Sequence, residues 1–209
     1  MKNKNLISKP IIKYLENNIF GNIKTFENIL FEENSKKEIT LSNITINSCK
    51  FVNIDFSNIN FDNIELVDCI FENCDLSNKV FDKKTIHRVE FNNSKLFGCS
   101  FAASSLKNII FVNCNSKYLN LYTTKMEKVL FKNSDISESY FYESSFKNVL
   151  FENTLLKSIE VINTSLKDID LTTCDIENIK IDLNSMKGLI VNMYQSIELS
   201  KYLHITIKY

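Results

Sequence analysis

An apolar residue recurs at every fifth position of the chain between residues 39 and 191, without one insertion or deletion. The series starts at Leu41 and continues to Val191, and Ser116 is the one position that breaks it. A period of five fits neither the 3.6-residue period of an amphipathic helix nor the two-residue alternation of a single strand. The repeat itself must therefore define the fold.

A second class of residue, small or β-branched, stands two positions before each apolar residue. A spacing of two places both classes on one side of a short extended segment, and the other three residues of each unit are mostly polar and must face water. Each unit is then a very short strand plus a turn, and four units would make a square coil of twenty residues. The clearest members of the second class are Cys49, Ile54, Ile59, Ile64, Cys69, Cys74, Val89, Ser94, Cys99, Ser104, Ile109 and Cys114.

The turns of such a coil need residues that tolerate left-handed backbone. The chain has only 3 glycines and 1 proline, so asparagine must take the turn position. The predicted turn residues are Asn53, Asn58, Asn63, Asn73, Asn78, Asn93, Asn108, Asn113, Asn133, Asn148, Asn153 and Asn163.

Units such as 74–78 (Cys-Asp-Leu-Ser-Asn) and 134–138 (Ser-Asp-Ile-Ser-Glu) resemble those of the pentapeptide-repeat family. The resemblance covers roughly three quarters of the chain. It implies an all-β protein, a right-handed quadrilateral β-helix with a short C-terminal helix and strand. We expect a lead-in and cap over residues 1–25, the β-helix over 26–191 and a C-terminal module over 192–209.

The two ends of the chain differ from the repeat. Ile11, Ile12, Leu15 and Ile19 could form a short amphipathic turn or helix that covers the open end of the coil stack. At the other end, Asn192 can cap a helix of about residues 193–202, and residues 204–209 alternate as a strand. This tail could plug the last coil, or an exposed strand edge could pair with its twin in a homodimer. The expected dimer residues are Met193, Tyr194, Ile197, Tyr202, Ile205 and Ile207.

Aligning residues that are twenty apart assigns them to the four walls of the square coil. It also gives one nearly pure aromatic column inside. On the outside, four aspartates should form an acidic line, and a second wall carries Lys107, Lys147, Lys167 and Lys187. Such charges on a solenoid can also be simply solvated. The column consists of Phe31, Phe51, Phe71, Phe91, Phe111, Phe131 and Phe151, and the acidic line of Asp55, Asp75, Asp135 and Asp175.

Two other outer features depart from a plain polar wall. Lys79 and Lys84 occupy inward positions, so the strands there must flare outward or the lysines must extend their ammonium groups to water. An apolar ribbon precedes the aromatic column and could bind a partner, or its side chains could fold against neighbouring coils. The ribbon consists of Leu30, Ile70, Ile110, Leu130 and Leu150.

Composition points away from catalysis and cofactors. The formal net charge is zero, with 25 basic and 25 acidic side chains, which gives no bulk electrostatic case for direct nucleic-acid binding. The chain has two histidines far apart, no glycine-rich phosphate loop and no cluster at metal-ligand spacing. We therefore expect no enzyme activity, no metal and no cofactor. All six cysteines fall in the inward class, which predicts free buried thiols rather than disulfides.

The chain also lacks a secretory signal and a membrane-length apolar run, so a cytoplasmic location without membrane contact is expected.

Residues 71–77, 86–91 and 188–191, with Gln195, Leu199 and Leu203, resemble one subgroup of this family. These stretches are similar to the Qnr-like pentapeptide proteins associated with quinolone resistance. The resemblance implies a rod-shaped homodimer, joined through its C-terminus, that mimics duplex DNA and engages DNA gyrase or topoisomerase IV. The acidic line would then stand in for phosphates. The alternative is a structural or scaffolding rod that binds another protein.

Overall fold

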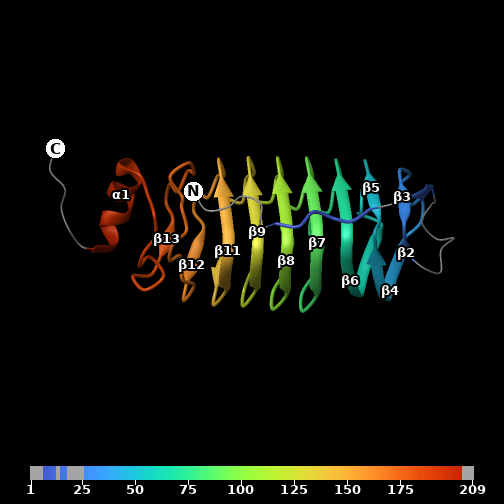
Figure 1. Cartoon of the computed structure of the whole chain (residues 1–209), viewed down its shortest axis with the longest axis horizontal. Helices are drawn as coiled ribbons and strands as arrows, with labels where there is room; N and C mark the ends of the chain where they lie inside the picture. Colours follow the sequence, from blue (N-terminus) through green and yellow to red (C-terminus); the bar gives the residue numbers. More distant parts are fainter. Residues whose placement is uncertain (1–6, 13–14, 18–25, 204–209) are drawn as a thin grey trace.

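The structure is a computed structural model that describes residues 7–12, 15–17 and 26–203. It is a rod of short parallel strands stacked along the long axis, with a helix at the C-terminal end (Figure 1). One sheet runs in the order β1-β3-β5-β6-β7-β8-β9-β11, with β4 between β2 and β6, and a second runs β10-β12-β13. The strands are β1 Glu16–Asn17, β2 Phe26–Glu27, β3 Ile29–Phe31, β4 Ile39–Asn47, β5 Lys50–Val52, β6 Ile59–Glu72, β7 Thr85–Asn92, β8 Ser105–Val112, β9 Lys125–Lys132, β10 Tyr140–Tyr142, β11 Ser145–Glu152, β12 Glu160–Ile162 and β13 Lys180–Ile181.

The strand register confirms a coil of twenty residues. Phe71 in β6 pairs with Phe91 in β7, which pairs with Phe111 in β8, and each step advances the sequence by one coil. Isolated bridges outside the named strands keep the same step on the other walls, as at Asp55 and Asp75. The expected quadrilateral β-helix is therefore confirmed.

The aromatic column fills the centre of the rod, as the sequence predicted. Its six successive ring pairs have centroids 4.6–5.3 Å apart and interplanar angles of 3–16°. The ring spacing matches the separation of neighbouring strands, so each phenylalanine stacks on its equivalents in the adjacent coils. Six of the seven rings are at most 1% exposed, and the last, Phe151, is 6% exposed.

The turns follow the asparagine pattern with one exception. Eleven of the twelve predicted asparagines have positive φ, between 48° and 60°, and Asn58 does not. Equivalent turn positions hold other residues in the same conformation, including Asp68 (φ 54°), Arg88 (φ 52°) and Tyr118 (φ 60°). Left-handed backbone is costly for such side chains, so the stacking of coils must impose it.

The small inward residues serve as hydrogen-bond donors to the coil beneath them. Ser94 Oγ donates to the carbonyls of Phe71 and Asn92 and accepts from the N–H of Cys74. The Cys114 thiol makes the same two donations, to Phe91 and Val112. This shared role explains why cysteine, serine and threonine replace one another at the small inward position of successive coils. All six cysteines are buried and free, as the sequence predicted.

Two unusual inward positions are accommodated without breaking the stack. Lys79 and Lys84 are half-buried, and their ammonium groups reach the surface at Ser57 and Asn63, each 3.5 Å away. The lysines therefore extend to solvent, and the strands do not flare. Ser116, which breaks the apolar series, is fully buried, and its Oγ has no hydrogen-bond partner among the described residues.

The N-terminal segment does not form the expected amphipathic turn or helix where the structure describes it. Residues 7–12 are extended and cross the strands along the outer face of the rod, from β8 towards β5 (Figure 1). We call residues 7–12 the strap. Beyond it, β1 pairs with Ile29 and Leu30 of β3 and so extends the sheet at its first edge. Ile19 lies outside the described residues.

The C-terminal segment covers the last coil with helix α1, Met193–Ser200, followed by the 3₁₀ helix η2, Lys201–Leu203. Asn192 caps α1 as predicted, in a reciprocal capping box with Gln195. The Gln195 amide also donates to the carbonyls of Leu171 and Cys174, each at 2.7 Å, and so satisfies acceptors that have no further coil to bind. The expected strand at 204–209 lies outside the described residues.

Candidate interaction surfaces

The four predicted acidic residues do lie in one column, but other side chains interrupt it. The bridges follow the order Asp55, Asp75, Lys95, Asn115, Asp135, Leu155 and Asp175. Lys95 pairs with Asp75 at 3.3 Å, Lys117 with Asp135 at 3.2 Å and Lys157 with Asp175 at 3.1 Å. The column therefore presents little uncompensated negative charge.

These aspartates also have a local structural role. The carboxylate of Asp75 accepts hydrogen bonds from the N–H and hydroxyl of Ser77, and Asp135 does the same with Ser137. Such a contact, from a side chain to the backbone two residues on, stabilises a turn. Burial would raise the pKa of Asp75, but the bonds from Ser77 and the ion pair with Lys95 together hold it below its usual value.

Two of the four lysines on the predicted lysine wall share one acidic partner. Glu127 lies between Lys107 and Lys147 in the register of β8, β9 and β11. The Lys107 ammonium is 3.6 Å from Glu127, and that of Lys147 is 3.1 Å away. The hydrogen bond from Lys147 lowers the pKa of Glu127, with Lys107 adding to the effect. Lys167 and Lys187 form no ion pair with a described residue, so this wall keeps an excess of positive charge.

The apolar ribbon is continuous over only part of its length. Lys50 and Glu90 occupy the same outward column and divide it. The unbroken part is Ile110, Leu130 and Leu150, of which Ile110 is only 7% exposed and the other two are half-buried. This part packs mainly against its own neighbours.

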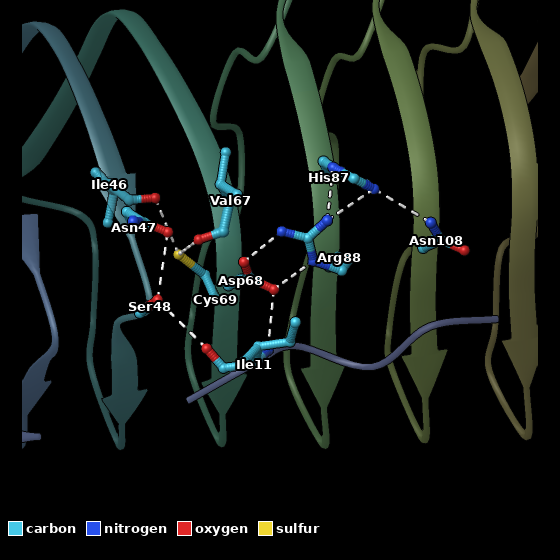
Figure 2. Close-up of polar contacts among 10 residues, drawn as sticks. All are labelled: Ile11, Ile46, Asn47, Ser48, Val67, Asp68, Cys69, His87, Arg88 and Asn108. Carbon is cyan, nitrogen blue, oxygen red and sulfur yellow. Dashed lines mark hydrogen bonds and ion pairs between the residues drawn. The ribbon is translucent and has the colours of Figure 1, made fainter. Parts of the chain in front are cut away.

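A buried polar cluster lies beneath the strap (Figure 2). Asp68 is 5% exposed, and its carboxylate accepts from Arg88 Nε at 2.6 Å and from Arg88 Nη2 at 2.5 Å. Asp68 Oδ1, which accepts from Arg88 Nε, also accepts from the backbone N–H of Ile11 at 2.9 Å. Ser48 Oγ donates to the carbonyl of Ile11 at 3.3 Å. One ion pair between coils thus also anchors the strap.

The cluster continues along the rod to His87 and Asn108. Arg88 Nη1 is 3.2 Å from His87 Nδ1, and Asn108 Nδ2 is 3.2 Å from His87 Nε2 (Figure 2). Burial, together with the charges of Arg88 and Lys107, lowers the pKa of His87. Asn108 also accepts from the N–H of Ser8, at 3.2 Å, which fixes the other end of the strap. These contacts hold both ends of the strap against the sheet.

The pKa of Asp68 reflects two opposing effects. Burial of its carboxylate raises the pKa, whereas the hydrogen bonds from Arg88 and Ile11 and the nearby positive charge lower it, and the lowering prevails. Asp68 is therefore a carboxylate at neutral pH, matched to the guanidinium that it contacts.

The described part of the predicted dimer surface divides into an exposed and a packed portion. Met193 and Tyr194 are 71% and 77% exposed, whereas Ile197 is half-buried. Tyr202 is also half-buried, and its hydroxyl donates to the carbonyl of Ile179 in the last coil. Ile205 and Ile207 lie outside the described residues.

Sequence reasoning missed a group of aromatic side chains on one outer wall. Phe97, Tyr118, Tyr122 and Tyr140 are 38–45% exposed, and Tyr142 is half-buried beside them. We call these five residues the tyrosine wall. Sorting by twenty could have revealed it, because Tyr122 and Tyr142 are one coil apart. The Tyr142 hydroxyl donates a hydrogen bond to Glu160, and this bond, together with burial, raises the pKa of Tyr142 to about 12.

Within the described ranges, no group of three or more His, Cys, Asp or Glu side chains is placed to hold a metal ion. None of the helices in that part of the chain has the length and apolar character needed to span a lipid bilayer.

The chain is similar to two solved structures over most of its length. Full-length QnrB1, a plasmid-mediated fluoroquinolone resistance protein, is 19% identical, with 92% of this chain and 97% of that chain covered and a TM-score of 0.46. HetL is a pentapeptide repeat protein involved in heterocyst differentiation regulation in the cyanobacterium Nostoc sp. strain PCC 7120. It is 10% identical, with 79% of this chain and 86% of that chain covered and a TM-score of 0.43. With both TM-scores below 0.5, neither protein's role transfers to this chain.

A comparison with the curated proteins found no match. The family model for the pentapeptide repeat region matches residues 64–141 and 84–161, and the model for eight copies of the pentapeptide repeat matches residues 41–78. Together these matches extend from residue 41 to residue 161, which is more than half of the chain, and the coil of twenty residues is the structure built by four such units. The chain therefore belongs to the pentapeptide-repeat family.

Proposed function

We propose that this chain is a non-enzymatic binding protein that works through its outer walls, and that its partner is a type II topoisomerase. The observation that supports a binding role is the filled interior. Inward residues from Phe31 to Ile181 are buried against one another along the rod, which leaves the outer walls to make contacts. The choice of DNA gyrase or topoisomerase IV comes from the sequence resemblance to Qnr-like proteins, and it includes an effect on quinolone sensitivity.

The acidic line contributes little to DNA mimicry. Asp55 and Asp175 are six coils apart along the bridged column, which corresponds to about 29 Å at 4.8 Å per strand. Duplex DNA carries about 17 phosphate charges over that length. The column offers four carboxylates, three of them paired with lysine. The proposal therefore rests on protein contacts along the walls, with Asp55 as the least compensated member of the line.

We also propose a homodimer joined through the C-terminal end. Met193 and Tyr194 support it, because two large side chains more than 70% exposed at one end of a rod form an apolar contact surface. A cytoplasmic location belongs to the same proposal and agrees with six free thiols, which persist in a reducing compartment.

A purified supercoiling assay tests the topoisomerase proposal. The full chain is titrated into DNA gyrase with relaxed plasmid, with and without a fluoroquinolone. We expect either inhibition of supercoiling or relief of drug inhibition at micromolar protein. The Met193→Ser, Tyr194→Ser variant tests the role of the dimer. It should weaken the effect if the dimer is the active form. No change in either direction, in supercoiling by gyrase and in decatenation by topoisomerase IV, would remove this partner.

The alternative function is a scaffolding rod with another protein partner. The unbroken apolar column of Ile110, Leu130 and Leu150 favours it, since a partner could cover its exposed part. Binding of an identified protein other than a topoisomerase, lost in Leu130→Lys and kept in Lys132→Gln, would support the scaffold. Retention of that binding in Leu130→Lys would exclude the apolar column as its contact.

A further inference from the structure

Exposed aromatic side chains are concentrated on a single wall. Phe97, Tyr118, Tyr122 and Tyr140 come from three consecutive coils, and Val80, 55% exposed, precedes them in the same outward column as Tyr140. The large apolar side chains exposed elsewhere in the described residues lie mainly near the C-terminal end or on the strap. Exposed aromatic side chains gathered in this way mark a contact site, and tyrosine is enriched at protein interfaces.

The rings of the tyrosine wall are held in place before any partner arrives. Phe97 and Tyr118 meet edge to face with centroids 5.0 Å apart, and Tyr140 and Tyr142 do so at 6.1 Å. Two hydrogen bonds also hold the rings in place. Tyr118 Oη donates to Glu138 at 2.8 Å, and Tyr122 Oη donates to Glu143 at 3.4 Å. A rigid aromatic surface loses little conformational entropy on binding.

The charged groups beside these rings include Lys117 but leave an excess of negative charge. Glu138 and Glu143 are exposed and form no ion pair with a lysine or arginine among the described residues. Lys117 pairs with Asp135 at 3.2 Å. Lys157, whose carbonyl accepts the Glu138 N–H, pairs with Asp175 at 3.1 Å and Glu177 at 2.7 Å. The wall thus differs from the acidic line, where lysines neutralise the carboxylates.

We propose that the tyrosine wall binds an arginine- and lysine-rich segment of a partner protein. Cations bind over aromatic faces, and a guanidinium or ammonium group also forms charge-assisted hydrogen bonds with carboxylates such as Glu138 and Glu143. An anionic ligand, nucleic acid included, would meet uncompensated negative charge instead. The wall extends over two coil steps, about 10 Å along the rod, which suits a short extended segment. This inference deepens the proposed binding role and does not depend on a topoisomerase.

Binding of a defined basic peptide to the full chain tests the inference. A fluorescein-labelled peptide of four Arg-Gly repeats is titrated with the protein at about 0.15 M ionic strength, and its anisotropy is recorded. A Glu-Gly peptide of equal length and a single-stranded oligonucleotide are the competing probes. We expect binding of the basic peptide alone.

The variants use residues that the same columns already contain, so that the coils still stack. Tyr118→Asn copies Asn78, and Tyr140→Ser copies Ser100, each from an equivalent position. The double variant, and separately Glu138→Gln with Glu143→Gln, should bind the basic peptide about tenfold more weakly.

The matched controls lie on other surfaces. Ile190→Ser removes an exposed apolar side chain from another column, and Glu33→Gln with Glu65→Gln removes the same charge as the carboxylate variant. Both should bind within about twofold of the parent. The inference is overturned if the basic peptide does not bind at about 1 mM, if the acidic peptide or the oligonucleotide binds equally, or if the controls weaken binding as much as the wall variants. Supercoiling assays do not enter this result, so the two proposals can fail separately.

Discussion

Arg88 and Asp68, one coil apart, are joined by two hydrogen bonds between a guanidinium and a carboxylate, at 2.6 Å and 2.5 Å. Both residues have left-handed backbone at equivalent turns, and the carboxylate also accepts the N–H of Ile11. A single contact therefore connects two coils and the strap that crosses them.

Removing the guanidinium should destabilise the fold. Arg88→Gln leaves the largely buried Asp68 carboxylate without its cation, and we expect a loss of about 1–3 kcal/mol in the free energy of unfolding. Urea denaturation measures the loss, and hydrogen exchange at Ile11 should quicken with it. Lys128→Gln is the matched control, because Lys128 has the same turn conformation (φ 58°) and should cost less than about 0.5 kcal/mol. Equal losses in the two variants would contradict the assigned role.

His87 should make stability depend on pH. Its pKa is lowered in the folded chain by burial, Arg88 and Lys107, whereas the unfolded chain titrates near the ordinary value of 6.5. Below that value the unfolded state binds more protons than the folded state, so the free energy of unfolding must fall as the pH falls from about 7 towards 5.5. Urea midpoints across this range should show the slope.

Removing the imidazole tests this prediction directly. His87→Gln should flatten the dependence between about pH 7 and 5.5, whereas Lys128→Gln, which keeps His87, should leave it in place. An unchanged slope in His87→Gln would show that another group titrates there.

The cysteines should be unreactive in the folded protein. Burial raises the pKa of Cys49, Cys74 and Cys114 to about 11 and that of Cys99 to about 12. The thiolate is the reactive form, so Ellman's reagent at about pH 8 should label almost none of the thiols until denaturant is added, and then all six. Rapid labelling of one or more thiols without denaturant would show that their column opens to solvent.

Two buried serines should respond oppositely to alanine. Ser116 Oγ is buried without a partner among the described residues, so Ser116→Ala removes an unsatisfied polar group and should raise stability by up to about 1 kcal/mol. Ser94 Oγ bonds to three backbone groups, and Ser94→Ala should lower stability by about 1–3 kcal/mol. Thermal melts of the two variants test the difference. Destabilisation in both would mean that Ser116 has an unrecognised partner.

The repeat predicted the interior well because each inward residue depends only on its place in a unit of five. The phenylalanine column, the buried thiols and the Asn192 cap all follow from local pattern. The strap could not be predicted in this way, since Ile11 contacts Asp68 across 57 residues and its apolar neighbours suggested a turn or helix. The pairing of Asp135 with Lys117 likewise depends on side-chain reach between coils. The tyrosine wall has no full column like that of the phenylalanines, because its five residues stand at four different places in the coil of twenty and only Tyr122 and Tyr142 repeat.

Both proposals require that the coils form one continuous stack, so that its walls are fixed surfaces. Spin labels on Asp55→Cys and Leu155→Cys test this directly, because these residues are five bridged coils apart in one outward column. Double electron–electron resonance should give a single narrow distance distribution near 24 Å, which is five steps of 4.8 Å. A broad distribution, or a mean below about 15 Å, would contradict the stack and with it the assignment of function to the outer walls.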